Sequence, residues 1–197
     1  MRKILMLSAV AVATAAPTAA QAQRAPAAAI VVVDSNRVYR ECNACRTAAA
    51  QLQAQVTAFQ NRQQTLMNQL KPEADALQAA ITALAGKQPD AALRTRAQAF
   101  QQKQEQAQQE LTRAEQNIQS IRANVSRQID ARYGPAVNQV MTQQGANLAV
   151  DVDNTIAHSA ALDVTPAVLA ALNATLPSLS MTPLPQQQQQ PQQPQGR

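Results

Sequence analysis

Aromatic residues are almost absent from the sequence. Among 197 residues there are two Tyr, two Phe and no Trp, which leaves little bulky material for the core of a compact enzyme. Proteins that bind single-stranded nucleic acid commonly stack its bases on aromatic side chains. The scarcity, together with the export signal described below, therefore argues against nucleic acid as a partner.

Residues suited to catalysis are also scarce. The sequence has one histidine, His158, so no credible Ser-His-Asp set exists, and no Gly-rich phosphate loop is present. His158 falls in a predicted short strand, where we expect a packing or rim residue. Asp34, Asp151 and Asp153 lie at predicted strand ends and a turn, without the regular spacing of a calcium loop. We expect no enzyme, no metal site and no cofactor.

The N-terminus has the features of a secretory signal peptide, predicted over residues 1–22. Arg2 and Lys3 precede about ten apolar residues and a small-x-small site that ends at Ala22. No other run approaches the roughly 20 apolar residues of a membrane span. We expect cleavage after about Ala22 and export to the periplasm, a compartment that permits disulfides. Loss of the two basic residues lowers the net charge from +5 to +3.

Two stretches in the middle of the chain repeat apolar residues in four-three steps. From Leu52 to Leu84, seven of the nine positions after the first are apolar, and from Leu93 to Val125 nine of all ten are. This spacing is typical of a coiled-coil seam. The seam is weak, because it includes polar residues and several alanines. The polar seam residues are Gln63, Glu73 and Gln104.

A turn is predicted between the two stretches. Gly86 can end one helix, and Pro89 and Asp90 can begin the next. We therefore predict an antiparallel helical hairpin arm over residues 46–133, with its turn near residues 85–92. Pro72 should kink the first helix, because proline removes a backbone donor and crowds the preceding turn.

The segments that flank the arm resemble strands. Residues 28–34, AAIVVVD, form a short β-branched run, and a strand alternation places Leu148, Val150 and Val152 at every second position. Asp153 and Asn154 suit a tight turn, after which a second short strand is predicted at residues 155–158.

The remaining boundaries of the flanking segments come from glycine and proline. Gly134-Pro135 is expected to break the second long helix, and Gly145 to end its continuation. Thr165-Pro166 predicts a further helix, with a capping hydroxyl and proline at the first helical position.

Together the flanks predict a small α+β body made from residues 23–45 and 134–176. A body of about three strands and one short helix is marginal alone, so we expect it to oligomerise. Its predicted core comprises Ile30, Val32, Leu148, Val150, Val152, Val168 and Leu172. The last segment, residues 177–197, is rich in Pro and Gln and is predicted to be disordered. A passive tail is favoured over a linker to the cell wall.

The order of these segments resembles the Skp/OmpH family of periplasmic chaperones. The resemblance rests on the strand ending VVVDSNRV, the Gln/Ala-rich hairpin, and the closing segment LAVDVDNTIAHSAALDVTPAVLAALN. It covers about residues 28–174. It implies a homotrimer whose small bodies share a β-barrel and whose helical arms surround a cavity. It also implies binding of unfolded outer-membrane β-barrel proteins without ATP.

The resemblance further implies basic residues near the arm tips. Here Lys87, Arg94 and Arg96 lie near the predicted turn, but acidic residues are interleaved with the arm's basic residues. Two interpretations therefore remain. The basic residues either form a face that is simply solvated, or they form a site for anionic lipid, lipopolysaccharide or an anionic client. A different class of function, a coiled-coil envelope spacer or tether without chaperone activity, also stays open.

Cys42 and Cys45 depart from the family pattern. A thioredoxin-like site needs a βαβ context that the following coiled coil does not supply, and a zinc site as a rule needs four ligands. Residues three apart on a helix lie about 5 to 6 Å apart, which suits a disulfide. We predict a local staple where body meets arm, with a bond between subunits as the alternative.

Overall fold

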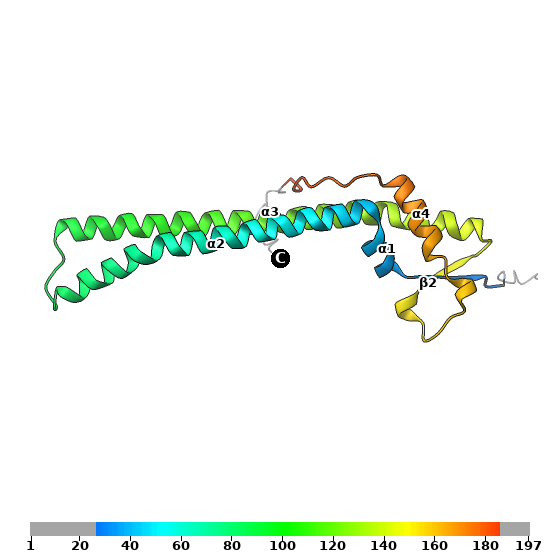
Figure 1. Cartoon of the computed structure of the whole chain (residues 1–197), viewed down its shortest axis with the longest axis horizontal. Coiled ribbons are helices and arrows are strands. Elements are labelled where there is room, and N and C mark those ends of the chain that lie inside the picture. The colour runs from blue at the N-terminus through cyan, green and yellow to red at the C-terminus, as the bar shows by residue number, and fades with distance from the viewer. Residues whose placement is uncertain (1–26, 186–197) are drawn as a thin grey trace, which may run out of the picture.

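The structure is a computed structural model that describes residues 27–185. The predicted signal peptide and residues 186–197 lie outside these residues. Along the chain, the elements are β1 (Ile30–Val33), α1 (Ser35–Glu41), α2 (Asn43–Ala83), α3 (Ala91–Gln143), β2 (Leu148–Asp151), η1 (Val152–Asn154), η2 (Ala160–Leu162) and α4 (Thr165–Thr175). The predicted class is confirmed: two long helices form an arm beside a small body with one pair of strands (Figure 1).

The arm is the hairpin of α2 and α3. The helices contain 41 and 53 residues, so at 1.5 Å per residue they extend for about 60 and about 80 Å. Of the ten seam positions predicted in each helix, all but Gln63, Ala97 and Gln104 are at least partly buried. The four-three spacing therefore identified the contact face correctly.

Two ion pairs join the helices of the arm. Lys103 Nζ lies 2.7 Å from Glu73 Oε2, and Arg62 donates to both carboxylate oxygens of Glu110. The Glu73 carboxylate thus has a partner on the opposite helix, which explains how the seam tolerates this residue. Because all four side chains are at least partly exposed, solvent screens both ion pairs, and they position the two helices more than they stabilise them.

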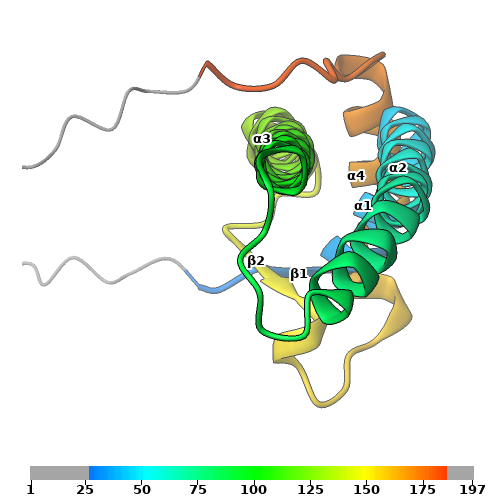
Figure 2. The ribbon, with the colours of Figure 1, turned by 90° about the vertical axis from the view of Figure 1, so that its left-hand side faces the viewer.

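The tip of the arm has the predicted turn. Helix α2 ends at Ala83, and the chain reverses through Ala85 and Gly86, whose φ angles are 47° and 86°. Asp90 then caps α3, because its carboxylate accepts a hydrogen bond of 2.7 Å from the Leu93 N–H. Towards this tip, α2 departs from α3 in both views (Figures 1 and 2).

Proline does not end either long helix. Pro72 lies inside α2, and Pro135 lies inside α3, so the predicted break at Gly134-Pro135 is wrong. Ala136 and Val140, just beyond the proline, are buried at 3% and 1% exposure. Their packing against the body offsets the lost backbone hydrogen bond, since tertiary contacts override local propensity. Helix α3 ends before Gly145, which has φ 66°, as predicted.

The sheet has two parallel strands rather than three strands. Residues 30–33 of β1 pair in register with residues 148–151 of β2. The strand predicted at residues 155–158 is wrong. The Thr155 N–H and hydroxyl both donate to the Val152 carbonyl, at 3.0 and 2.9 Å, and close a local turn instead. A single bridge between Val32 and Asp163 lies on the other side of β1.

The start of the C-terminal tail is ordered, which corrects the prediction of disorder for residues 177–185. This segment runs beside α3 in extended form (Figure 1). Leu179 and Met181 pack against the main core, and polar side chains of α3 bond to the segment's backbone. The Pro/Gln composition concealed these few well-placed contacts.

Candidate functional site

The two cysteines lie where the body meets the arm. Cys42 separates α1 from α2 with a non-helical backbone, and its Sγ accepts a hydrogen bond of 3.2 Å from the Cys45 N–H. The pair forms a disulfide with Cα atoms 5.1 Å apart. Both residues are buried, at 0% and 6% exposure. Thiol exchange needs access to a sulfur, so this burial favours a structural role.

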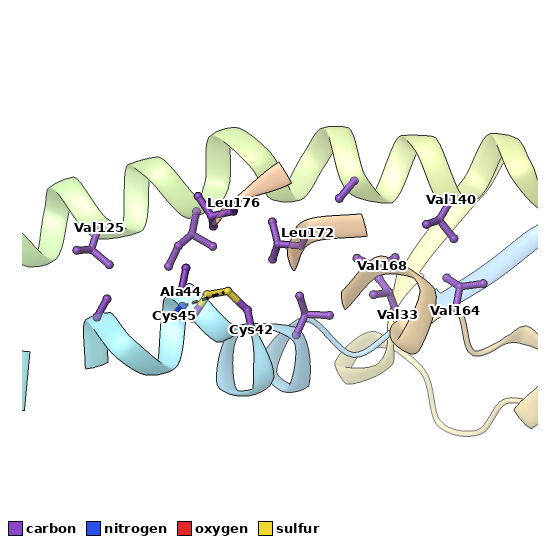
Figure 3. Close-up of a cluster of buried hydrophobic side chains, with 14 of the residues drawn as sticks. Val33, Cys42, Ala44, Cys45, Val125, Val140, Val164, Val168, Leu172 and Leu176 are labelled. Atoms are coloured by element: carbon purple, nitrogen blue, oxygen red, sulfur yellow. Dashed lines mark hydrogen bonds between the residues drawn. A yellow bond between two sulfur atoms is a disulfide. The ribbon is translucent and has the colours of Figure 1, made fainter. Parts of the chain in front are cut away.

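The disulfide belongs to a cluster of buried side chains at the base of the arm (Figure 3). Helix α2 contributes Ala44 and Ala48, α3 contributes Val125, and α4 contributes Leu172 together with the residue that caps its C-terminus, Leu176. The cysteines therefore lie among three helices that meet at the base of the arm. We propose that the bridge fixes the direction in which α2 leaves the body.

Replacing both cysteines, Cys42→Ala with Cys45→Ala, is expected to lower the free energy of unfolding by about 2 kcal/mol, because the short covalent loop no longer constrains the unfolded chain. Urea unfolding followed by circular dichroism measures the loss. A reductant should weaken the native protein similarly and leave the double variant unaffected. An unchanged native transition under reductant would show that the bridge does not stabilise the fold.

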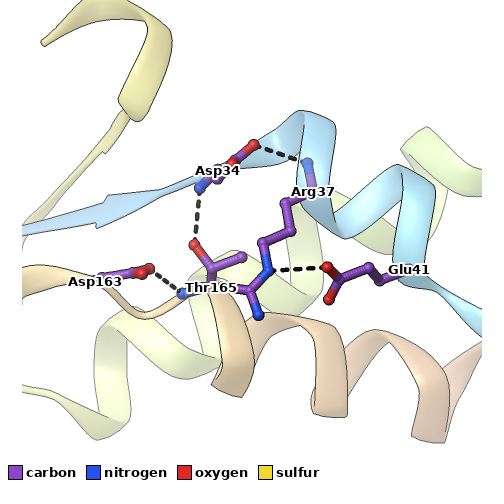
Figure 4. Close-up of polar contacts among 5 residues, drawn as sticks. All are labelled: Asp34, Arg37, Glu41, Asp163 and Thr165. Atoms are coloured by element: carbon purple, nitrogen blue, oxygen red, sulfur yellow. Dashed lines mark hydrogen bonds and ion pairs between the residues drawn. The ribbon is translucent and has the colours of Figure 1, made fainter. Parts of the chain in front are cut away.

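A second set of contacts joins β1 and α1 to α4 (Figure 4). The Asp34 carboxylate accepts a hydrogen bond of 2.7 Å from the Arg37 N–H, and the Asp34 N–H donates to Thr165 Oγ1 at 2.9 Å. The Asp163 carboxylate accepts from the Thr165 N–H at 2.8 Å. The prediction that the Thr165 hydroxyl caps α4 is therefore wrong. Asp163 binds the first amide of α4, and the hydroxyl binds the end of β1.

The hydrogen bonds from Thr165 lower the pKa of Asp163, outweighing the opposing effect of partial burial. Because the folded state lowers this pKa, the ionised carboxylate stabilises the fold at any pH above the ordinary carboxyl pKa. This stabilisation is lost below about pH 4, as the pH falls through the lowered pKa of the folded state. The stability advantage of the native protein over Asp163→Asn should therefore shrink in acid. Asp163→Ala should cost about 1 kcal/mol at pH 7, since the amide loses its acceptor. Urea unfolding from pH 7 to pH 2.5 tests both, and a constant difference from Asn would contradict the charge effect.

The predicted body core divides into three groups by exposure. Val32, Val168 and Leu172 are buried at 3%, 0% and 0% exposure. Ile30 and Leu148 are exposed at 42% and 46%, although they are direct partners in the sheet. Val150 and Val152 are partly buried. One end of the strand pair therefore presents adjacent apolar side chains to solvent.

The basic residues near the tip point to solvent. Lys87, Arg94 and Arg96 are exposed, and no ion pair involves them within residues 27–185. Lys71 and Lys103, further from the tip, are paired with Asp75 and Glu73. Within the described residues, the tip of the arm therefore carries positive charges that no acidic side chain pairs.

The other candidate residues have local roles. His158 lies exposed in the loop before η2. Asp151 accepts a hydrogen bond of 3.0 Å from the Asp153 N–H, and Asp153 accepts one of 2.6 Å from Asn36 Nδ2. Across the described part of the chain, no three His, Cys, Asp or Glu side chains are grouped to hold a metal. No helix there is long and apolar enough to cross a bilayer.

An aromatic pair at the arm base was missed by sequence reasoning. The rings of Tyr39 and Tyr133 lie 5.2 Å apart, and the Tyr39 hydroxyl is 3.3 Å from Asp130 Oδ1. Burial, and then the Asp130 charge, raise the pKa of Tyr39 to about 12. A hollow of about 370 Å³ is lined by both Tyr39 and Asp130. No local pattern links these residues, because they come from separate helices.

The sequence and the fold were both compared with known proteins. The sequence model of the family described as Outer membrane protein (OmpH-like) matches residues 29–172. A crystal structure of a protein from Caulobacter crescentus CB15, assigned as an OmpH-like outer membrane chaperone, superposes with a TM-score of 0.67 at 20% identity. The match covers 86% of this chain and 98% of that chain. A search of curated proteins finds no match.

Proposed function

Because the chain belongs to the family of OmpH-like outer membrane proteins, we propose that it is an ATP-independent periplasmic holdase. In this proposal, it binds unfolded outer-membrane β-barrel proteins in a cavity between the arms of a homotrimer. Unfolded barrel proteins expose unpaired strands and apolar faces, which aggregate. The Caulobacter protein that shares the fold is assigned as an outer membrane chaperone, which supports this role.

The observation that carries the proposal is the shape of the chain. Helices α2 and α3 project far from a body whose sheet has two strands (Figure 1). Most residues along the arm are exposed. Several such arms fixed at one end can enclose a client and touch it weakly at many points, without a tight pocket.

The body supports assembly into a homotrimer. A two-stranded sheet is marginally stable alone, and Ile30 and Leu148 lie side by side and exposed at one of its ends. Burying them against other copies removes apolar surface from water at about 25 cal/mol per Å². The number of three subunits comes from the family resemblance.

The tip supports contact with anions. Lys87, Arg94 and Arg96 hold positive charge where the arms end, so anionic lipid, lipopolysaccharide or acidic client segments are the partners expected there. The attraction should weaken with added salt, because exposed charges are screened beyond about 10 Å at 0.1 M.

The decisive experiment dilutes a urea-unfolded outer-membrane barrel into buffer and follows its light scattering. The full chain, without its predicted signal peptide, should suppress scattering at a few-fold molar excess without ATP. Sedimentation velocity on the same sample should show the trimer. Unchanged scattering beside a normal trimer would favour the alternative, a coiled-coil tether or spacer.

A further inference from the structure

The extended segment 177–185, here called the strap, is held to α3 through its main chain. Gln128 Oε1 accepts a hydrogen bond of 2.9 Å from the Ser180 N–H, and Gln128 Nε2 donates at 3.0 Å to the Ser180 carbonyl. One amide side chain thus binds both main-chain groups of one residue. A neighbouring β-strand makes the same pair of bonds.

Two further side chains of α3 continue the pattern. Asn124 Nδ2 donates at 2.7 Å to the Thr182 carbonyl, and Ser120 Oγ donates at 3.3 Å to the Leu184 carbonyl. The bonds therefore advance one helical turn on α3 for every two strap residues, in opposite chain directions. Four helical residues rise about 6.0 Å and two extended residues about 6.6 Å. The two repeats nearly match, so the register holds over all three contact points.

α3 binds the strap mainly through the strap's main chain, and the strap's polar side chains add little to this contact. Leu179 and Met181 pack against the apolar core, while Ser180 and Thr182 are exposed. The surface therefore requires an extended main chain with alternate apolar side chains. Strands of membrane barrels have this pattern, with apolar residues at every second position.

We propose that Ser120, Asn124 and Gln128 form a binding site for extended polypeptide, and that the strap occupies this site in the free protein. An unfolded strand binds by displacing the strap and takes over its main-chain hydrogen bonds. The identity of the natural ligand rests on the proposed holdase function, whereas the existence of the site does not. The strap also keeps Asn124, which is 7% exposed, away from water until a client arrives.

The site is tested with a strap-released variant, in which residues 179–184 are replaced by alternating Gly and Ser within the full-length chain. A fluorescent peptide with the strap sequence, PSLSMTPLP, serves as the probe in anisotropy titrations. It should bind the released variant at least about tenfold more tightly than the native protein, because the intramolecular competitor is gone. Adding Gln128→Ala should weaken this binding about tenfold, since two hydrogen bonds are lost.

Gln139→Ala in the released variant is the matched control, because Gln139 is an exposed glutamine on the same helix. It should leave peptide binding unchanged. Equal weak binding of the peptide to the native and released proteins, or equal losses from Gln128→Ala and Gln139→Ala, would overturn the site.

A second titration uses a urea-unfolded outer-membrane barrel in place of the peptide. The released variant should bind it several-fold more tightly than the native protein, and Gln128→Ala should remove that gain. If the peptide binds as expected but neither protein binds the barrel, the site stands and the holdase proposal fails. If the barrel binds both proteins equally, the holdase proposal stands and displacement of the strap is refuted.

Discussion

Leu148→Asp is expected to convert the assembled protein into single chains and to abolish suppression of client aggregation. Leu148 is 46% exposed in one chain and lies beside Ile30, which is 42% exposed. In the proposed trimer both would be buried, and an unpaired carboxylate there costs several kcal/mol at each interface. Sedimentation velocity at micromolar concentration measures the change.

The control for this result is Met67→Asp. Met67 is also an exposed apolar residue, at 59%, but it lies on the arm. This variant should remain assembled. If Leu148→Asp sediments like the native oligomer, the strand end is not part of the interface. If the native protein itself sediments as one chain, the cavity between several arms does not exist.

The assembly variant also separates two sources of client binding. Single chains keep the arm and the strap site but lose any enclosed space between arms. If the single chains still bind the peptide PSLSMTPLP weakly but let the client aggregate fully, then the client is held by the space between the arms. Retained suppression by single chains would instead assign holding to the arm surface itself.

The arm was predictable because its signal is repeated many times along the sequence. Each four-three step adds independent evidence for one helical face, so isolated exceptions such as Gln63 and Glu73 did not obscure it. The tip turn was predictable for a different reason. Gly86 adopts a positive φ, and Asp90 accepts from a helix amide, and both roles follow from the residue type alone.

The body was less predictable because its contacts join distant residues. The break expected at Pro135 ignored the burial of Val140, and the cap expected from Thr165 ignored the Asp34 amide across the body. The order of residues 177–185 was missed for the same reason. Asn124 and Gln128 bond to main-chain groups of the tail, and on a Gln-rich helix such polar side chains do not stand out from their neighbours in the sequence.

Leu172→Ala is expected to lower the free energy of unfolding by about 3 kcal/mol, because it removes buried surface and leaves a cavity. Leu172 is fully buried where α4 meets the disulfide and α3 (Figure 3). Leu169→Ala is the matched control on the same helix, and its partly buried side chain should cost less.

Urea unfolding, followed by circular dichroism at one fixed protein concentration, measures both losses, because assembly makes stability depend on concentration. Helix α4 contributes few helical residues beside α2 and α3, so the arm dominates the signal. A parallel loss of arm helicity in Leu172→Ala would show that the arm depends on the body for its stability. Arm unfolding that stays unchanged while assembly is lost would show that the body and the arm unfold independently, and that α4 stabilises only the body.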